Sequence, residues 1–146
     1  MDTLAYTPGA AAHLTGPSPT GPVGTVHLQP RGDRVLVTVW LKGLPESETG
    51  FFALHIHEGT SCSGAGFPLT LSHYNPTGRP HPRHAGDLPA LLSCAGEAYL
   101  QVLTDRFSIS EVIGRTVVIH SGPDDFRSQP AGNAGEKIAC GVIYPT

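Results

Sequence analysis

Two histidines stand one residue apart in the segment FFALHIHEG, at positions 55 and 57. Successive side chains of a β-strand point to opposite faces, so His55 and His57 would share one face of a strand. The apolar residues Phe52, Leu54 and Ile56 would then share the other face and point into a core. The segment therefore predicts a strand that presents two imidazoles side by side, which is half of a metal site.

The rest of the chain is patterned as short strands separated by turn signals. Strands are predicted near residues 11–14, 24–29, 34–41, 87–92, 98–104, 115–120 and 137–144. The sequence contains 18 Gly and 14 Pro, and only 14% of its residues are charged, which favours many turns and few helices. We expect no more than one short helical turn, in SISEVIG at residues 108–114. About eight short strands predict an all-β fold, either an antiparallel sandwich or a barrel.

A chain of 146 residues is expected to form one domain. Residues 1–20 hold few periodic apolar residues, so we expect a loosely ordered N-terminal arm at 1–20 and a domain at 21–146. No apolar run approaches the roughly 20 residues that span a membrane. The net charge of -3 argues against a general affinity for nucleic acid. The first residues lack a basic start and an apolar segment, so either the protein stays inside the cell or a secretory signal has been removed.

Two long segments carry no strand or helix pattern, at residues 58–86 and 121–136. Loops longer than about 15 residues are uncommon in compact domains and are often functional. Each of the two loops follows a strand-end histidine, His57 or His120. The first loop contains His73, His81 and His84, so we expect the loops to complete a metal site rather than to carry unrelated surface histidines. Two other histidines, at positions 13 and 27, are expected to be ordinary surface residues.

The side-chain types narrow the choice of metal. Imidazole ligands suit copper and zinc, and zinc also accepts a carboxylate. An all-imidazole set favours copper: His55, His57, His73 and His120. A set of three imidazoles and one carboxylate fits tetrahedral zinc: His73, His81, His84 and Asp87. His73 belongs to both sets, which it can do if its ring is deprotonated and binds through both nitrogens.

The three cysteines are Cys62, Cys94 and Cys140, and none lies in a CxxC motif. They allow at most one internal disulfide, and three pairings are open on the spacing alone.

Several motifs occur together and in order: LHIHE, HYNPTG, RHAGDLPAL, IGRTVVIH followed by DD, and GNAGEKIACGVI. Over about residues 22–146 this pattern resembles the copper–zinc superoxide dismutase family, and LHIHEGTSC and GDLPAL resemble its bacterial secreted branch. The resemblance implies an eight-stranded antiparallel Greek-key barrel or sandwich, with two long loops forming the metal site. It also implies an enzyme that disproportionates superoxide to oxygen and hydrogen peroxide at a redox-cycling copper. Dimers are common in the family, which leaves a homodimer open.

The resemblance assigns a role to each matching residue. His55, His57 and His120 match the copper ligands, His73 the bridging histidine, and His81, His84 and Asp87 the remaining zinc ligands. Asp124 matches the carboxylate that ties a zinc ligand to a copper ligand. Cys62 and Cys140 match the family disulfide, which leaves Cys94 as a free thiol. His73 and Lys137 match the catalytic residues: the histidine leaves copper and takes up a proton on reduction, and the cation attracts the substrate.

This sequence departs from the family pattern at three places. Lys137 stands where the family has an arginine; it keeps the charge but loses the planar two-pronged donor, so we expect weakened activity. The alternative is that Lys137 only pairs with a surface carboxylate. The second loop is shorter than in many members and contains Asp124, Asp125 and Arg127, which predicts poorer steering of the substrate or a more open copper site.

The third departure is the short spacing between two zinc ligands. Only Pro82 and Arg83 separate His81 from His84. In an extended chain these histidines would lie roughly 10 Å apart. A β-turn with Pro82 at its second position would bring their backbones within about 7 Å. We therefore expect a cramped zinc site; the alternative is that His81 is displaced and the site is weak or empty.

Two other classes of function stay open. A copper-binding relative with little or no turnover would act in copper storage or delivery, and a metal-free interaction sandwich would keep its histidines as relics. A structural disulfide and the bacterial-type motifs predict the periplasm or the cell exterior, with the cytoplasm as the alternative.

Overall fold

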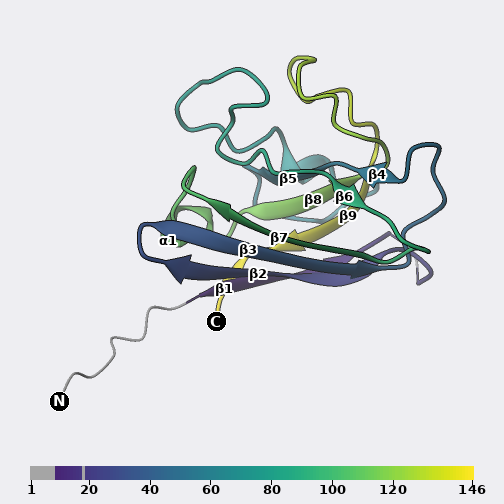
Figure 1. The fold of residues 1–146 in the computed structure, drawn as a ribbon, viewed down its shortest axis with the longest axis horizontal. Helices are drawn as coiled ribbons and strands as arrows, with labels where there is room; N and C mark the ends of the chain where they lie inside the picture. The colour runs from purple at the N-terminus through teal and green to yellow at the C-terminus, as the bar shows by residue number, and fades with distance from the viewer. Residues whose placement is uncertain (1–8, 18) are drawn as a thin grey trace.

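The computed structural model describes residues 9–17 and 19–146, and the chain is almost entirely β-structure (Figure 1). The strands are β1 (Ala10–Thr15), β2 (Val23–Arg31), β3 (Arg34–Lys42), β4 (Phe51–Phe52), β5 (Leu54–His57), β6 (Leu91–Leu92), β7 (Ala98–Thr104), β8 (Thr116–His120), β9 (Lys137–Val142) and β10 (Tyr144–Pro145). A 3-10 turn covers Pro68–Thr70, and the short helix α1 covers Ile109–Val112 within the segment where one helical turn was predicted. Every strand pair is antiparallel.

The strands form one large curled sheet and one small one. The order in the large sheet is β5-β8-β9-β1-β2-β3-β7, and β10 also pairs with β1. The small sheet pairs β4 with β6. Because β4 runs into the edge strand β5 and β6 precedes the edge strand β7, the small sheet joins the two edges of the large one. This arrangement confirms the predicted antiparallel β-barrel architecture.

Residues Ala10–Thr15 of the expected N-terminal arm form a strand of the sheet. Strand β1 lies between β9 and β2, and Ala10, Ala12 and Leu14 belong to the hydrophobic core. Ala11, on the opposite face, is buried as well. Three consecutive buried alanines give no alternation and have weak strand preference, so the sequence pattern indicated only a short strand near residues 11–14. Residues 1–8 and 18 of that arm lie outside the described part of the chain.

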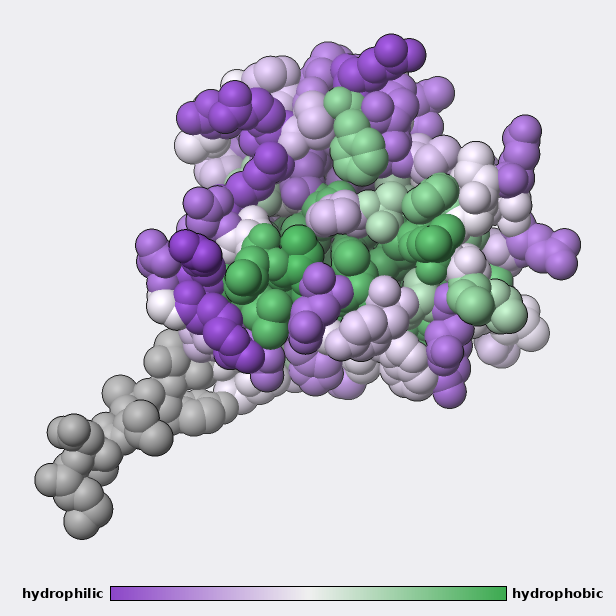
Figure 2. Space-filling view, viewed as in Figure 1, coloured by the Kyte–Doolittle hydropathy of each residue, from purple (hydrophilic) through white to green (hydrophobic). Residues whose placement is uncertain are grey.

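The core follows the alternation of the strands. In β3, residues Val35, Val37, Val39 and Leu41 are buried in the core, and the residues between them are exposed or half-buried. In β5 the alternation is hidden, because all four residues are buried. Leu54 and Ile56 face the core as predicted, and the long loops cover the other face. Figure 2 shows apolar side chains gathered across the middle of one face, below hydrophilic loops.

Both long loops rise from the same side of the sheet, above β5 and β8 (Figure 1). A disulfide between Cys62 and Cys140, with a Cα–Cα distance of 5.8 Å, fastens the first loop to β9. The predicted pairing is therefore confirmed, and Cys94 is a free, exposed cysteine. Within residues 9–17 and 19–146, no helix has the length and apolar character needed to cross a membrane.

Candidate metal centre

The first loop is pinned onto β5 through backbone contacts on both sides of Ile56. The Ile56 amide donates to the carbonyl of Gly86 at 2.9 Å, and the Ile56 carbonyl accepts from the Tyr74 amide at 2.8 Å. A Cβ on Gly86 would stand 2.2 Å from the Ile56 oxygen, so this approach requires glycine. These contacts place the neighbouring residues His73 and Asp87 beside the strand, where they form isolated β-bridges with its two histidines.

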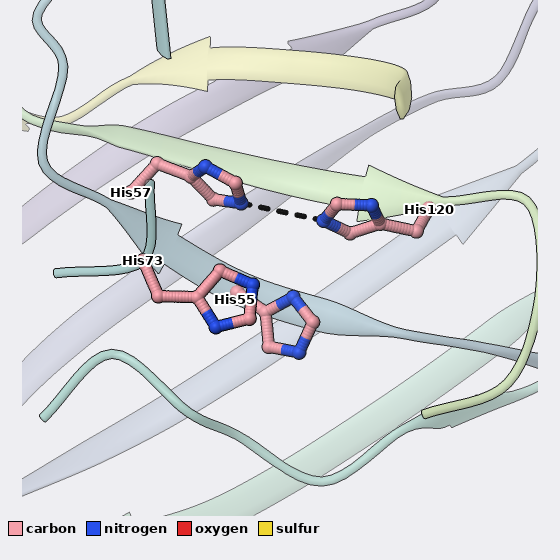
Figure 3. A group of neighbouring side chains, drawn as sticks. All are labelled: His55, His57, His73 and His120. Carbon is pink, nitrogen blue, oxygen red and sulfur yellow. Dashed lines mark hydrogen bonds between the residues drawn. The ribbon is translucent and has the colours of Figure 1, made fainter. Parts of the chain in front are cut away.

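Four imidazoles meet at this place, from two strands and one loop (Figure 3). They belong to His55 and His57 of β5, His73 of the first loop and His120 at the end of β8. One ring nitrogen from each lies within 4.8 Å of the others, and all four residues are buried. The structure thus brings together all four residues that the sequence predicts as copper ligands.

The hydrogen bonds of His57 and His120 determine which nitrogen each ring turns inward. His57 donates from Nδ1 to the carbonyl of Leu71 at 2.9 Å, and His120 donates from Nδ1 to the carbonyl of Gly135 at 3.3 Å. A carbonyl can only accept, so the Nε2 atom of each neutral ring carries a lone pair. These two Nε2 atoms face each other at 3.3 Å, the contact drawn in Figure 3. Two lone pairs at this distance fit a cation between them.

A proton is not that cation at neutral pH. Burial, reinforced by the charges of neighbouring histidines, lowers the pKa of His57 to about 2 and that of His120 to about 3. Both rings are therefore neutral at pH 7, the form in which imidazole binds a metal.

Unpartnered atoms supply a second test of the fit. His55 donates from Nε2 to Asp124 Oδ2 at 2.8 Å, which leaves its Nδ1 without a partner. His73 Nε2 and His81 Nδ1 are the other buried side-chain atoms that lack a hydrogen bond in the described residues. His81 Nδ1 lies 3.0 Å from an Asp87 oxygen, but the ring donates its hydrogen from Nε2 to Asp124, so two lone pairs face each other there. Buried polar atoms are normally satisfied, and all three exceptions belong to the predicted ligand sets. A bound metal explains each of them.

A second cluster lies directly beside the first and is centred on one carboxylate. Asp87 Oδ1 lies 2.9 Å from His73 Nδ1, and Asp87 Oδ2 lies 3.0 Å from His81 Nδ1 and 3.3 Å from His84 Nδ1. Burial would raise the pKa of Asp87, but the hydrogen bond from His73 and the neighbouring histidines outweigh it and lower that pKa. Three imidazoles and an ionised carboxylate are typical of a tetrahedral zinc site.

His73 is the one residue that the two clusters share. Its Nδ1 faces Asp87 and lies 3.2 Å from His84 Nδ1, whereas its unpartnered Nε2 faces the imidazoles of the first cluster. Its ring centroid is 3.8 Å from that of His55. One imidazole can therefore offer one nitrogen to each of two metals.

Asp124, in the second loop, connects the clusters a second time. Its Oδ2 accepts from His55 Nε2 at 2.8 Å, and its Oδ1 accepts from His81 Nε2 at 2.7 Å. Burial alone would raise the pKa of Asp124, but these two hydrogen bonds outweigh it, and the pKa lies well below its usual range. Asp124 is therefore an anion that turns the Nδ1 of both rings toward the metal positions.

The turn that brings His81 near His84 differs in register from the prediction. The Arg83 amide donates to the Pro80 carbonyl at 2.8 Å, so the turn spans residues 80–83 rather than 81–84. Pro82 occupies the third position of this turn rather than the second, and the peptide bond before it is cis. His81 is buried and its ring centroid lies 5.4 Å from that of His84, so it is not displaced.

Lys137 lies on β9 directly opposite His120 and is half-buried. Its ammonium donates to Thr70 Oγ1 at 2.7 Å, to the Leu71 carbonyl at 3.2 Å and to the Phe67 carbonyl at 3.5 Å. Burial lowers its pKa from the usual value. No carboxylate pairs with Lys137 among the residues that the structure describes, which excludes the alternative of a surface ion pair there.

Sequence reasoning missed the backbone acceptors of the site. The Leu71 carbonyl accepts from both His57 and Lys137, and Leu71 has a φ of 60°, which is unusual for a leucine. No residue type signals such a carbonyl.

His13 and His27 are exposed and lie outside both clusters, as expected. His13 Nε2 contacts the Tyr144 hydroxyl at 2.6 Å.

Comparison with known proteins agrees with this geometry. The sequence profile of the family described as copper/zinc superoxide dismutase (SODC) matches residues 22–143. Copper–zinc superoxide dismutase 2 of Aquifex aeolicus is 39% identical in an alignment 136 residues long that covers 83% of this chain and 78% of that protein. The copper–zinc superoxide dismutase of Legionella pneumophila is 34% identical in an alignment of 144 residues that covers 92% of this chain and 85% of that protein. The human copper chaperone for superoxide dismutase is 33% identical in an alignment of 152 residues, gaps included, that covers 92% of this chain and 52% of that protein.

A family match over most of the chain, two adjoining ligand clusters and a shared histidine agree with one another, and the family's cofactors are copper and zinc. The chain belongs to the copper/zinc superoxide dismutase family.

Proposed function

We propose that this protein disproportionates superoxide to oxygen and hydrogen peroxide. The observation that carries the proposal is His73, whose two nitrogens face two different ligand clusters. Copper, when bound, supplies the one-electron redox chemistry. We assign copper to His55, His57, His73 and His120, and zinc to His73, His81, His84 and Asp87.

His73 is proposed as the residue that handles a proton. Its Nε2 makes no hydrogen bond within the described residues, so this atom is free to take up a proton and to give it to the product. Its Nδ1 is held beside Asp87, which prevents the ring from turning away while Nε2 changes its protonation state. Holding the ring at one nitrogen thus keeps the other nitrogen in place for the next cycle.

Lys137 is proposed to attract the anionic substrate. Its ammonium has three hydrogens, and three protein oxygens already lie within 3.5 Å of it. It therefore acts through its positive charge rather than through a free hydrogen-bond donor. A point charge beside His120 raises the local concentration of a small anion but does not orient that anion as a guanidinium would.

Metal content and activity test this proposal together. The purified protein is loaded with copper and zinc at neutral pH, loose metal is removed, and both metals are measured per chain before a superoxide-removal assay. One copper and one zinc per chain with rapid turnover is the expected result. If the protein removes superoxide with copper bound but no zinc, the proposed bridging role of His73 is contradicted. If the protein fails to bind copper, the enzymatic assignment is overturned.

A second candidate is a copper-binding relative with weak or no catalysis. The similarity to a protein named as a copper chaperone and the lysine at position 137 support it. If a fully copper-loaded sample removes superoxide no faster than buffer without protein, this candidate is favoured over the first.

We also propose an oxidising compartment, the periplasm or the cell exterior, because structural disulfides such as Cys62–Cys140 are rare in compartments that keep thiols reduced. Trapping free thiols in intact cells tests this: labelling of Cys62 would contradict it and indicate the cytoplasm. A homodimer stays a prediction that sedimentation of the metal-loaded protein can check.

A further inference from the structure

The segment His81–His84 has few means of holding its own shape. Only Pro82 and Arg83 separate the two histidines, and Pro82 has no amide hydrogen. The Arg83 amide is used in the turn with Pro80. His84 is held within the same loop, because its amide donates to Asp87 Oδ2 at 2.9 Å and its carbonyl accepts from the Asp87 amide at 3.1 Å. The backbone groups of His81 and the carbonyl of Pro82 must find partners elsewhere in the molecule.

The side chain of Gln129, in the second loop, supplies two of these partners. The His81 amide donates to Gln129 Oε1 at 2.9 Å, and Gln129 Nε2 donates to the His81 carbonyl at 2.7 Å. One amide side chain thus satisfies both backbone groups of a zinc-cluster residue, as a neighbouring strand would. A third bond, from Gln129 Nε2 to the Arg127 carbonyl at 3.1 Å, fixes the glutamine to its own loop.

Arg106, in the connection between β7 and α1, binds the same segment at a different point. Its guanidinium donates to the Pro82 carbonyl at 2.7 Å and to the His84 carbonyl at 3.3 Å. The two carbonyls lie on either side of Arg83, so a single nitrogen of Arg106 holds the curve of the segment. Gln129 and Arg106 are both exposed residues, and neither contributes to the hydrophobic core.

The ring of His81 is enclosed by the same loop that carries Gln129. Its Nε2 donates to Asp124, and a Cβ added to Gly132 would lie 2.0 Å from Asp124 Oδ1 and 2.6 Å from His81 Nε2. With the ring and the backbone both fixed from the second loop, His81 Nδ1 has one orientation, toward Asp87.

We infer that Gln129 and Arg106 are positioning residues for the second metal cluster, which set the affinity for zinc by holding His81 and His84 from outside their own short loop. The inference rests on the proposed zinc site at His73, His81, His84 and Asp87. Partners that orient metal ligands typically change metal affinity by about 10–100-fold when they are removed.

The test measures zinc affinity in variants that lose these hydrogen bonds. Gln129→Met removes both bonds to His81 at similar side-chain length, and Arg106→Met removes both bonds to the carbonyls. We expect each variant to raise the zinc Kd at least tenfold in competition with a chelator, while the copper Kd changes less than threefold. Gln129→Glu keeps the acceptor for the His81 amide but loses the donor, so its zinc Kd should lie between those of the wild type and Gln129→Met.

Matched controls come from exposed side chains of the same types. Gln101 hydrogen-bonds Thr38 on the outer face of β7. The side chain of Arg79 makes neither a hydrogen bond nor an ion pair within the described residues, and only its backbone bonds Asn75. Gln101→Met and Arg79→Met should leave the zinc Kd unchanged within twofold.

A spectroscopic readout separates positioning from general stability. Cobalt(II) placed in the zinc site absorbs visible light in a manner that depends on ligand geometry, so Gln129→Met should change the band shape. A purely structural role would lower the melting temperature of the metal-free protein and leave both the cobalt spectrum and the zinc Kd unaltered; that result overturns the inference.

The affinity measurements distinguish two kinds of failure. If the wild type and Gln129→Met have the same zinc Kd, this inference alone is overturned. If the wild type binds no zinc, the inference is overturned together with the proposed zinc site. If Gln129→Met fails to fold, Gln129→Glu and Arg106→Met decide the question.

Discussion

At the scale of single residues, hydrogen bonds outside the clusters decide which nitrogen each histidine turns inward. Asp124 does this for one histidine of each cluster, since its two oxygens accept from His55 and His81. In Asp124→Asn one of these oxygens becomes an amide nitrogen, which donates and so opposes an imidazole N–H. We expect the zinc Kd to rise by about 10–100-fold, measured by chelator competition.

The neighbouring carboxylate provides the control for that prediction. Among the described residues, the Asp125 carboxylate bonds only within its own loop, where it accepts from the backbone amides of Arg127 and Ser128 and from the Ser128 hydroxyl. Asp125→Asn should keep the zinc affinity of the wild type. Equal zinc affinity in the Asp124 and Asp125 variants would show that the carboxylate bridge does not orient the ligands.

The buried histidines also predict how acid affects the metal-free protein. In the folded state the pKa of His57 is about 2 and that of His120 about 3, because burial disfavours the charged ring, whereas the unfolded chain titrates near its usual value of 6.5. Below pH 6.5 the unfolded state therefore binds more protons, and the free energy of unfolding falls as the pH falls. The slope is about 1.4 kcal/mol per pH unit for each such histidine, down to the folded-state pKa.

Urea denaturation of the metal-free protein between pH 7 and pH 5 measures this slope. His57→Gln should reduce the slope, because it removes one of the buried rings. A free energy of unfolding that stays constant over this range would mean that the rings are not held neutral.

Lys137 is predicted to act by charge alone. Lys137→Met removes the charge and should lower the second-order rate constant for superoxide about tenfold, within the range for electrostatic steering. The rate should also become less sensitive to ionic strength, because salt screens only the charged form. Lys42→Met, which changes a lysine over the ring of Trp40 on the outer face, is the control and should retain both the rate and its salt dependence.

At the scale of secondary structure, the strands that the sequence predicted well are those with one buried face. Apolar and polar residues alternate clearly at 34–41 and 98–104, and the predicted bounds of these two strands lie within one residue of those of β3 and β7. Where both faces are buried or the side chains are small, as in β1, alternation gives little signal. Ligand types and spacing, read with the family resemblance, selected the residues that the structure brings together. The register of the Pro80–Arg83 turn and the carbonyls of Leu71 and Gly135 depend on tertiary contacts, which no local pattern encodes.

The position of β1 inside the sheet leads to a stability prediction. Leu14 is fully buried in the core, so Leu14→Ala should lower the free energy of unfolding by about 2–5 kcal/mol. Thr15→Ala, at an exposed position of the same strand, should cost much less. Urea denaturation of both variants makes the comparison. Two equal and small losses would indicate that the strand detaches from the sheet in solution.

At the scale of the whole molecule, the disulfide is the covalent link between the first loop and the last long strand. It joins residues 78 positions apart, and constraining a segment of this length in the unfolded chain typically contributes about 2–4 kcal/mol. The double variant Cys62→Ser, Cys140→Ser should therefore melt at a lower temperature than the wild type. Cys94→Ser, which alters the exposed free thiol, should have the same melting temperature as the wild type. Equal melting temperatures in all three proteins would contradict the stabilising role.

The same disulfide makes residues 62–140 a closed covalent ring. His55 and His57 lie before the ring, and the other proposed ligands, from His73 to His120, lie within it. A protease that cuts the second loop, or the first loop after Cys62, would thus open the ring without releasing a fragment, and the two pieces would migrate as one species on a non-reducing gel. Metal ligands on separate pieces would remain tethered to one another, so a nicked molecule could keep its metals until a reductant reached the bond.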